Sequence, residues 1–134
     1  MNACDLMVGD YIKSLSTGMI GKIVEIGLSC VVVDGKIGAR QHIAYDEIVP
    51  IFITKPILLC NGWKYEDITK STLILDVDKP MAGDGFECQW MRFFPDKTVF
   101  MYTTATGIGS IVCKYVHELQ HIIMCIGFNK KIEL

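Results

Sequence analysis

The chain has 134 residues, which suffices for one domain, or for two small units, to bury a core and fold alone. Its net charge of −2 argues against general binding of nucleic acid, because that function needs clustered lysine and arginine. Apolar runs such as Ile51–Ile53 and Ile57–Cys60 are far too short to cross a bilayer, so no membrane association is expected.

Six cysteines are scattered along the chain, and no two of them form a C-x-x-C pair. This spacing excludes a zinc-ribbon or thioredoxin-like motif. Cysteines beside apolar residues, such as Cys30 before Val31, are typical of small core residues in a reduced protein. The first residues also show no basic segment followed by an apolar one, so the sequence predicts a cytoplasmic location.

Residues 8–52 predict a meander of short strands separated by tight turns. Val8–Ser14 and Met19–Ile26 are the first two strands, and strict alternation puts Ile20 and Ile26 of the second on one face and Ile23 on the other. Four or five such strands in about 45 residues fit a small SH3-like β-barrel, because closure removes exposed edges.

The third and fourth strands of this meander are expected at Cys30–Val33 and Ala39–Tyr45. Asp34 and Gly35 lie between them and form a hairpin signal, since both central residues of a type I′ turn need positive φ.

Residues 53–134 predict a sheet with two helices. The first helix is expected near 54–62, with Thr54 as N-cap and Pro56 in the first turn. Thr72–Val77 predicts a strand. Phe86–Phe94 and Thr98–Thr103 predict a hairpin, in which half of the aromatic side chains should belong to the core.

The chain is then expected to turn at Thr106–Gly109, to form a last strand at Ile111–Tyr115 and to end in a helix near 116–126. At about 100° per residue the apolar side chains of this helix fall on one side, and Gly127 stands at the C-cap position. These apolar side chains are Tyr115, Val116, Leu119, Ile122, Ile123 and Ile126. The fold class is therefore expected to be α+β, with an SH3-like barrel at 1–52 and a mostly antiparallel sheet with two helices at 53–134, sharing one core.

Several segments carry a family resemblance, namely Asp5–Tyr11, Asp46–Thr54, Ile57–Trp63, Tyr115–His121 and Ile132–Leu134. They resemble a family of small uncharacterised proteins of gut anaerobes, often encoded in bacteriophage or mobile-element regions. Its members begin with a short strand and finish with a helix of the pattern Y-V-H-x-L-Q. The family has no established activity and no fixed residues at the positions of Glu118 and His121, so the resemblance implies a fold and a context without a mechanism.

His117, Glu118 and His121 match the H-E-x-x-H pattern of zinc peptidases, in which two imidazoles four residues apart bind one metal and the glutamate polarises water. The two histidines fall on the side opposite Leu119, which also fits an ordinary solvated face. A catalytic site needs a third ligand, and Glu87 or His42 could supply it only through tertiary structure. We therefore expect no metal site.

Two further motifs are incomplete. Gly107 and Gly109 suggest a dinucleotide fingerprint, but Val112 stands at the third glycine position, and a tight turn is the expected structure. A second set of residues matches four ligand positions of an EF-hand loop, although a proline and a methionine occupy positions where a ligand and a glycine are required. These residues are Asp76, Asp78, Asp84 and Glu87, with Pro80 and Met81 at the mismatched positions.

Together these patterns predict a non-enzymatic accessory or interaction protein of bacteriophage or mobile-element type, with an unknown protein partner, no cofactor and no catalytic residues. Two alternatives stay open: a zinc-dependent hydrolase using His117, Glu118 and His121, and nucleic-acid binding through the barrel, which the charge does not favour. The oligomeric state also stays open.

Overall fold

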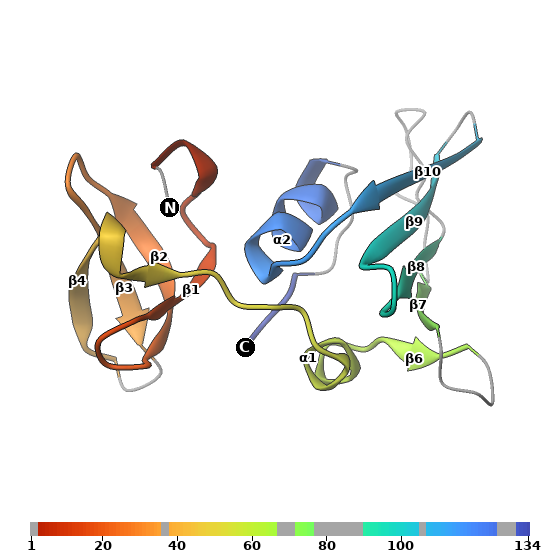
Figure 1. The fold of residues 1–134 in the computed structure, drawn as a ribbon, viewed down its shortest axis with the longest axis horizontal. Helices are drawn as coiled ribbons and strands as arrows, with labels where there is room; N and C mark the ends of the chain where they lie inside the picture. The colour runs from red at the N-terminus through yellow and green to blue at the C-terminus, as the bar shows by residue number, and fades with distance from the viewer. Residues whose placement is uncertain (1–2, 36–37, 67–71, 77–89, 105–106, 126–130) are drawn as a thin grey trace. The chain divides into compact units, whose positions relative to one another are not determined.

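The computed structural model describes residues 3–35, 38–66, 72–76, 90–104, 107–125 and 131–134 (Figure 1). Within them it confirms the α+β fold class: two five-stranded antiparallel sheets are accompanied by two helices. The chain divides into two compact units, one made of Met1–Phe52 with Tyr115–His117 and the other of Ile53–Lys114 with Glu118–Leu134.

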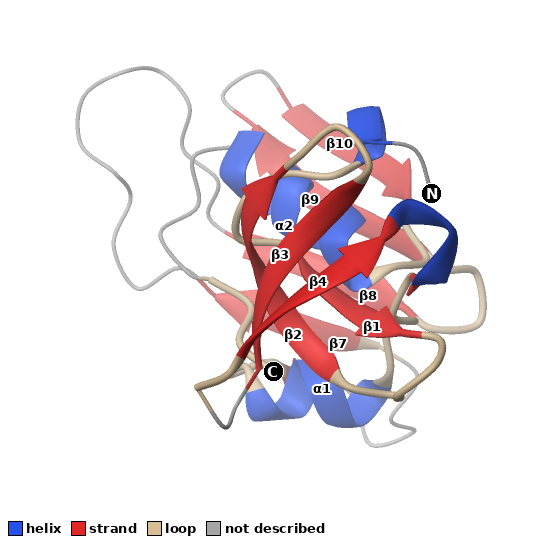
Figure 2. Ribbon diagram, turned by 90° about the vertical axis from the view of Figure 1, so that its left-hand side faces the viewer, coloured by secondary structure: helices blue, strands red, loops and turns tan. Residues whose placement is uncertain are grey.

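The first unit holds a curled half-barrel, which Figure 2 shows face on. Its strands lie in the order β4-β3-β2-β1-β5, so that β5 returns beside β1 after the meander. A 3-10 turn at Tyr45–Glu47 connects β4 to β5. The strands are β1 (Tyr11–Ser14), β2 (Ile20–Ile26), β3 (Cys30–Gly35), β4 (Arg40–Ala44) and β5 (Ile48–Val49). The buried core of this unit consists of Leu6, Ile12, Ile23, Val31, Val33, Ile43 and Ile48.

A bulge in β2 changes which face its side chains reach. Ile23 pairs with Val33 and Ile26 pairs with Val31, while the register between β2 and β3 shifts after Ile23. The extra residue places Ile26 against the same core as Ile23, although strict alternation put them on opposite faces. The predicted alternation is therefore wrong beyond the bulge.

The hairpin between β3 and β4 exists, but its turn does not lie at Asp34 and Gly35. Both residues are still part of β3, and Asp34 pairs with Arg40 of β4. The reversal comes later, where Gly38 has a φ of 78° and its N–H donates to the carbonyl of Gly35. The Asp-Gly turn prediction is wrong because cross-strand pairing extends past it.

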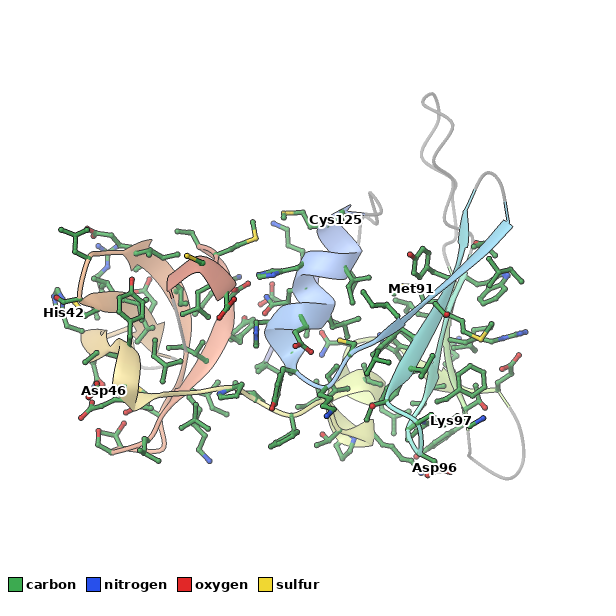
Figure 3. All side chains as sticks on the ribbon, turned by 45° about the horizontal axis from the view of Figure 1, so that its top comes forward. His42, Asp46, Met91, Asp96, Lys97 and Cys125 are labelled. Carbon is green, nitrogen blue, oxygen red and sulfur yellow. The ribbon has the colours of Figure 1, made fainter. Side chains whose placement is uncertain are left out.

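The second unit holds a sheet in the order β10-β9-β8-β7-β6, with both helices on one face (Figure 1). Its elements are α1 (Lys55–Cys60), β6 (Lys64–Tyr65), β7 (Leu73–Asp76), β8 (Trp90–Phe94), β9 (Val99–Thr104), β10 (Gly107–Val112) and α2 (Val116–Cys125). Phe100 is fully buried between Phe93, stacked at 4.4 Å between ring centroids, and Trp63, edge-on at 5.6 Å. Asp96 and Lys97 stand at the tip of the β8–β9 hairpin (Figure 3).

Helix α1 begins and ends as expected from its sequence. The Thr54 hydroxyl accepts a hydrogen bond from the Ile57 N–H, and Pro56 lies in the first turn. Asn61 caps the other end by donating from its side chain to the Ile57 carbonyl at 2.8 Å. The same amide group pairs with the backbone of Glu133, giving a 2.9 Å bond to its carbonyl and accepting a 2.7 Å bond from its N–H.

Gly107 to Gly109 do not form the expected turn, because they are the first half of strand β10. Gly109 pairs with Tyr102 of β9, and a Cβ at Gly109 would stand 2.5 Å from the Tyr102 ring. Glycine at position 109 therefore leaves room for the Tyr102 ring to lie against the strand, and it does not form a turn. The predicted C-cap at Gly127 lies outside the described residues.

Candidate functional site

His117, the first histidine of the peptidase-like motif, is buried. His117 is only 4% exposed, and its ring stacks on that of Tyr115 with 5.8 Å between centroids. The expectation that it faces solvent is wrong. The prediction treated α2 as a helix that packs on one core along its whole length. In the structure, Val116 and His117 belong to the first unit, and the residues from Glu118 onwards belong to the second.

The other two motif residues have different surroundings. Glu118 lies in the first turn of α2, and its carboxylate accepts a 3.0 Å hydrogen bond from the backbone N–H of Lys114. A carboxylate at this position fixes the start of a helix and is favoured by the helix dipole. His121, one turn further along, is half-buried.

The described part of the chain contains no group of three histidine, cysteine, aspartate or glutamate side chains that could hold a metal ion. His42, considered above as a third ligand, is on β4 in the first unit, where it is exposed (Figure 3). Glu87, Asp78 and Asp84 lie outside the described residues, as does the side chain of Asp76, so the EF-hand pattern falls there too. Among the described residues, the zinc hypothesis therefore rests on His117 and His121 as ligands and on Glu118, which caps the helix, and no third ligand lies beside them.

Among the described residues, the structure places the thiol of Cys30 beside the imidazole of His42, a pairing that the sequence does not predict. The Cys30 sulfur lies 3.8 Å from Nδ1 of His42, because β3 and β4 pair in a register that places these residues diagonally. A thiol and an imidazole at this distance form a weak hydrogen bond.

The feature with the clearest capacity to bind another polypeptide is the edge of the second sheet that β10 forms. This strand ends the second sheet, with β9 as its one neighbour among the described residues. Every residue of β10 except Gly109 is exposed, and Ile108 and Val112 are each 63% exposed. A neutral, apolar strand of this length at a sheet edge can pair with another extended chain.

The hydrogen-bonding groups of this edge follow from the ladder with β9. Cys113 donates its N–H to the Thr98 carbonyl at 2.8 Å, so alternate residues back along β10 face β9. The N–H and C=O groups of Ile108, Ser110 and Val112 therefore point away from the sheet. These three residues also share one face of the sheet, because side chains alternate along a strand.

The other three sheet edges carry features that discourage pairing. β5 and β6 have two residues each, and β6 begins with Lys64. β4 presents Arg40, in an ion pair with Asp34 at 3.2 Å, followed by polar Gln41 and His42. Short strands and charged side chains are the usual protection of a sheet edge. Among the described strands, β10 is the edge without either feature.

The outer face of the sheet next to this edge, on the side away from the helices, carries aromatic and cationic side chains. The Arg92 guanidinium lies over the Trp90 ring at 4.5 Å from its centroid and forms a 2.6 Å ion pair with Glu66. Cross-strand pairs continue from Arg92 to Met101 of β9 and then to Ser110 of β10. Of the three aromatic residues of β8, Phe93 is buried in the core, whereas Trp90 and Phe94 are half-buried.

Sequence reasoning missed this edge because it assigned Gly107 and Gly109 to a turn. A usable signal was present: residues 98–113 contain no charged side chain, between Lys97 and Lys114.

Comparison with known proteins gives no family model, no curated protein and no solved structure that matches this chain. No helix among the described residues is long and apolar enough to span a membrane.

Proposed function

We propose that this protein is a non-enzymatic interaction protein that binds an extended segment of another polypeptide along the edge of β10. The observation that carries this proposal is an uncharged, exposed edge strand in a protein whose other described edges are short or polar. Peptides that add a strand to a sheet gain affinity from backbone hydrogen bonds and specificity from alternate side chains.

Both elements of such recognition are available at β10. Ile108, Ser110 and Val112 supply outward N–H and C=O groups at the spacing of an antiparallel or parallel ladder. The side chains of Ile108 and Val112 flank Ser110 on the outer face, where an incoming strand would place its own apolar residues. The resemblance to proteins encoded by bacteriophages and mobile elements supports an accessory role of this kind.

The arrangement of the peptidase-like motif favours this proposal over zinc hydrolysis. Glu118 is engaged as a helix cap, and His117 is buried against Tyr115. A zinc-bound water would need an accessible glutamate beside two accessible imidazoles. His117 lacks that access here, and the Glu118 carboxylate already accepts a hydrogen bond from the Lys114 N–H.

The test is selection of a library of random linear peptides on the immobilised protein, followed by affinity measurement on variants. We expect the selected peptides to alternate apolar and polar residues, and Ile108→Lys to weaken their binding by about tenfold or more, because an edge lysine opposes strand addition. Leu15→Lys is the matched control, since Leu15 is 68% exposed and lies in the first unit. Failure to select any peptide, or equal binding to Ile108→Lys, would overturn the proposal.

A further inference from the structure

We infer that the segment that pairs with β10 is the β10 strand of a second copy of this chain, so that two second-unit sheets join into one antiparallel sheet. This inference rests on the proposed function of the edge and names its partner. A two-fold axis makes such an interface isologous, which requires the edge to be complementary to itself.

The sequence of β10 meets that requirement in one register. With the two-fold axis at Ser110, Ser110 faces its own copy and Ile108 faces Val112 of the other chain. These are the three residues whose N–H and C=O groups point outward, so each facing pair exchanges two N–H···O bonds as in any antiparallel ladder. A slip of two residues would lose one of these pairs and set Ser110 against an apolar side chain.

Side-chain sizes agree with the same register on both faces of the joined sheet. On the outer face, Ile108 meets Val112 of the second copy, and both are exposed in the single chain. On the inner face, Gly109 stands opposite Ile111 of the second copy, so the residue with no side chain meets a branched one. The exposed apolar surface of Ile108, Ile111 and Val112 is covered by this pairing.

Charge does not oppose the association. Residues 98–113 carry no charged side chain, so no like charges meet at the axis. The net charge of −2 is also small enough for two copies to approach each other without strong repulsion. Since a single pair of strands forms a small interface, we expect a dissociation constant in roughly the micromolar range.

The first experiment is sedimentation equilibrium of the purified full chain over a concentration series that spans the micromolar range. We expect a reversible monomer–dimer equilibrium in the parent protein and in the Leu15→Lys control. Ser110→Pro removes only an outward N–H, which a sheet edge tolerates, and should weaken dimerisation by about tenfold or more. A chain that stays monomeric, or a dimer that Ser110→Pro leaves unchanged, would overturn the inference.

The second experiment tests the register and does not depend on the folding of the proline variant. Residues of a hydrogen-bonded antiparallel pair have Cα atoms about 5.5 Å apart, within the range of a disulfide. Ser110→Cys should therefore form a disulfide-linked dimer under mild oxidation, with the 110–110 link identified by peptide mass spectrometry. Ile108→Cys, which faces Val112 of the other copy, should not link to itself.

The two proposals fail in different ways. A monomeric chain without a 110–110 link that still selects peptides sensitive to Ile108→Lys would overturn the dimer and leave the interaction function in place. A chain that neither dimerises nor selects peptides would overturn both.

Discussion

Leu119 and His117 are two positions apart in α2, and both are almost fully buried. Leu119→Ala should lower the free energy of unfolding by about 2–5 kcal/mol, because a large buried side chain is replaced by a cavity. His117→Ala should cost about 1–3 kcal/mol through the loss of a buried ring stacked on Tyr115. His121→Ala, at a half-buried position, should cost about 0.5 kcal/mol. Thermal or urea unfolding of the three variants measures this order.

The same series distinguishes a packed helix from a metal-binding one. If α2 is held by packing, a chelator should leave the melting temperature of the parent protein and of all three variants unchanged. A structural zinc ion would make both histidines costly to replace and the parent sensitive to chelator, since metal-binding energy is also folding energy. Equal losses for His117→Ala and His121→Ala together with chelator sensitivity would contradict our interpretation.

At the scale of elements, the side-chain amide of Asn61 connects α1 to residues 131–134 through hydrogen bonds. Asn61 makes hydrogen bonds to Ile57 and to both backbone groups of Glu133, and the neighbouring Ile132 is buried. Asn61→Ala should lower the free energy of unfolding by about 1–3 kcal/mol, because it removes three hydrogen bonds between the Asn61 side chain and the backbone. Urea unfolding measures the loss.

Deletion of residues 131–134 provides the control for this prediction. The deletion removes the backbone to which Asn61 pairs, so Asn61→Ala should cost much less in the shortened chain than in the full one. If the two losses are simply additive, the contact between Asn61 and Glu133 does not contribute to stability.

How far the sequence predicts these elements depends on whether the signal is local. The start of α1 was predictable, because Thr54 and Pro56 act on their own helix. The bulge in β2 and the late turn after β3 were not, because both are set by the register against a neighbouring strand. Gly109 illustrates the same limit: its role depends on Tyr102, which reaches it only across the sheet.

The candidate binding edge at β10 likewise has one property that the sequence shows and one that only the structure shows. The lack of charge in residues 98–113 can be read directly from the sequence, whereas the position of β10 at the end of a sheet requires the strand order. His117 gives the opposite case, in which a periodic pattern predicted exposure and the structure shows burial. Periodicity places side chains relative to one helix axis and cannot describe a helix whose two ends belong to different units.

At the scale of the whole molecule, the chain passes between its two units more than once. Phe52 pairs with Tyr115 through an antiparallel bridge and a ring contact of 5.1 Å, and Val116 donates its N–H to the Ile51 carbonyl at 2.8 Å. All four residues belong to the first unit. The first unit is therefore not equivalent to its contiguous part, residues 1–52.

A fragment of residues 1–52 should consequently be less stable than a fragment in which a short glycine-serine linker joins Phe52 to Tyr115–His117. The second fragment restores the ring contact and the hydrogen bond to Ile51, which the first lacks. Melting of both fragments, followed by circular dichroism, measures the difference. Equal melting temperatures would show that Tyr115–His117 do not contribute to the stability of the half-barrel.

This interleaving bears on the order in which the protein is made. A ribosome delivers residues 1–52 first and Tyr115–His117 only after the whole of residues 53–114. Glu118–Leu134, which complete the second unit, follow later still. Domains that are contiguous in sequence can fold one after another during translation. Here the contiguous part of each unit lacks a segment that is made only after residue 114, so neither unit can complete its structure before that later segment has been made.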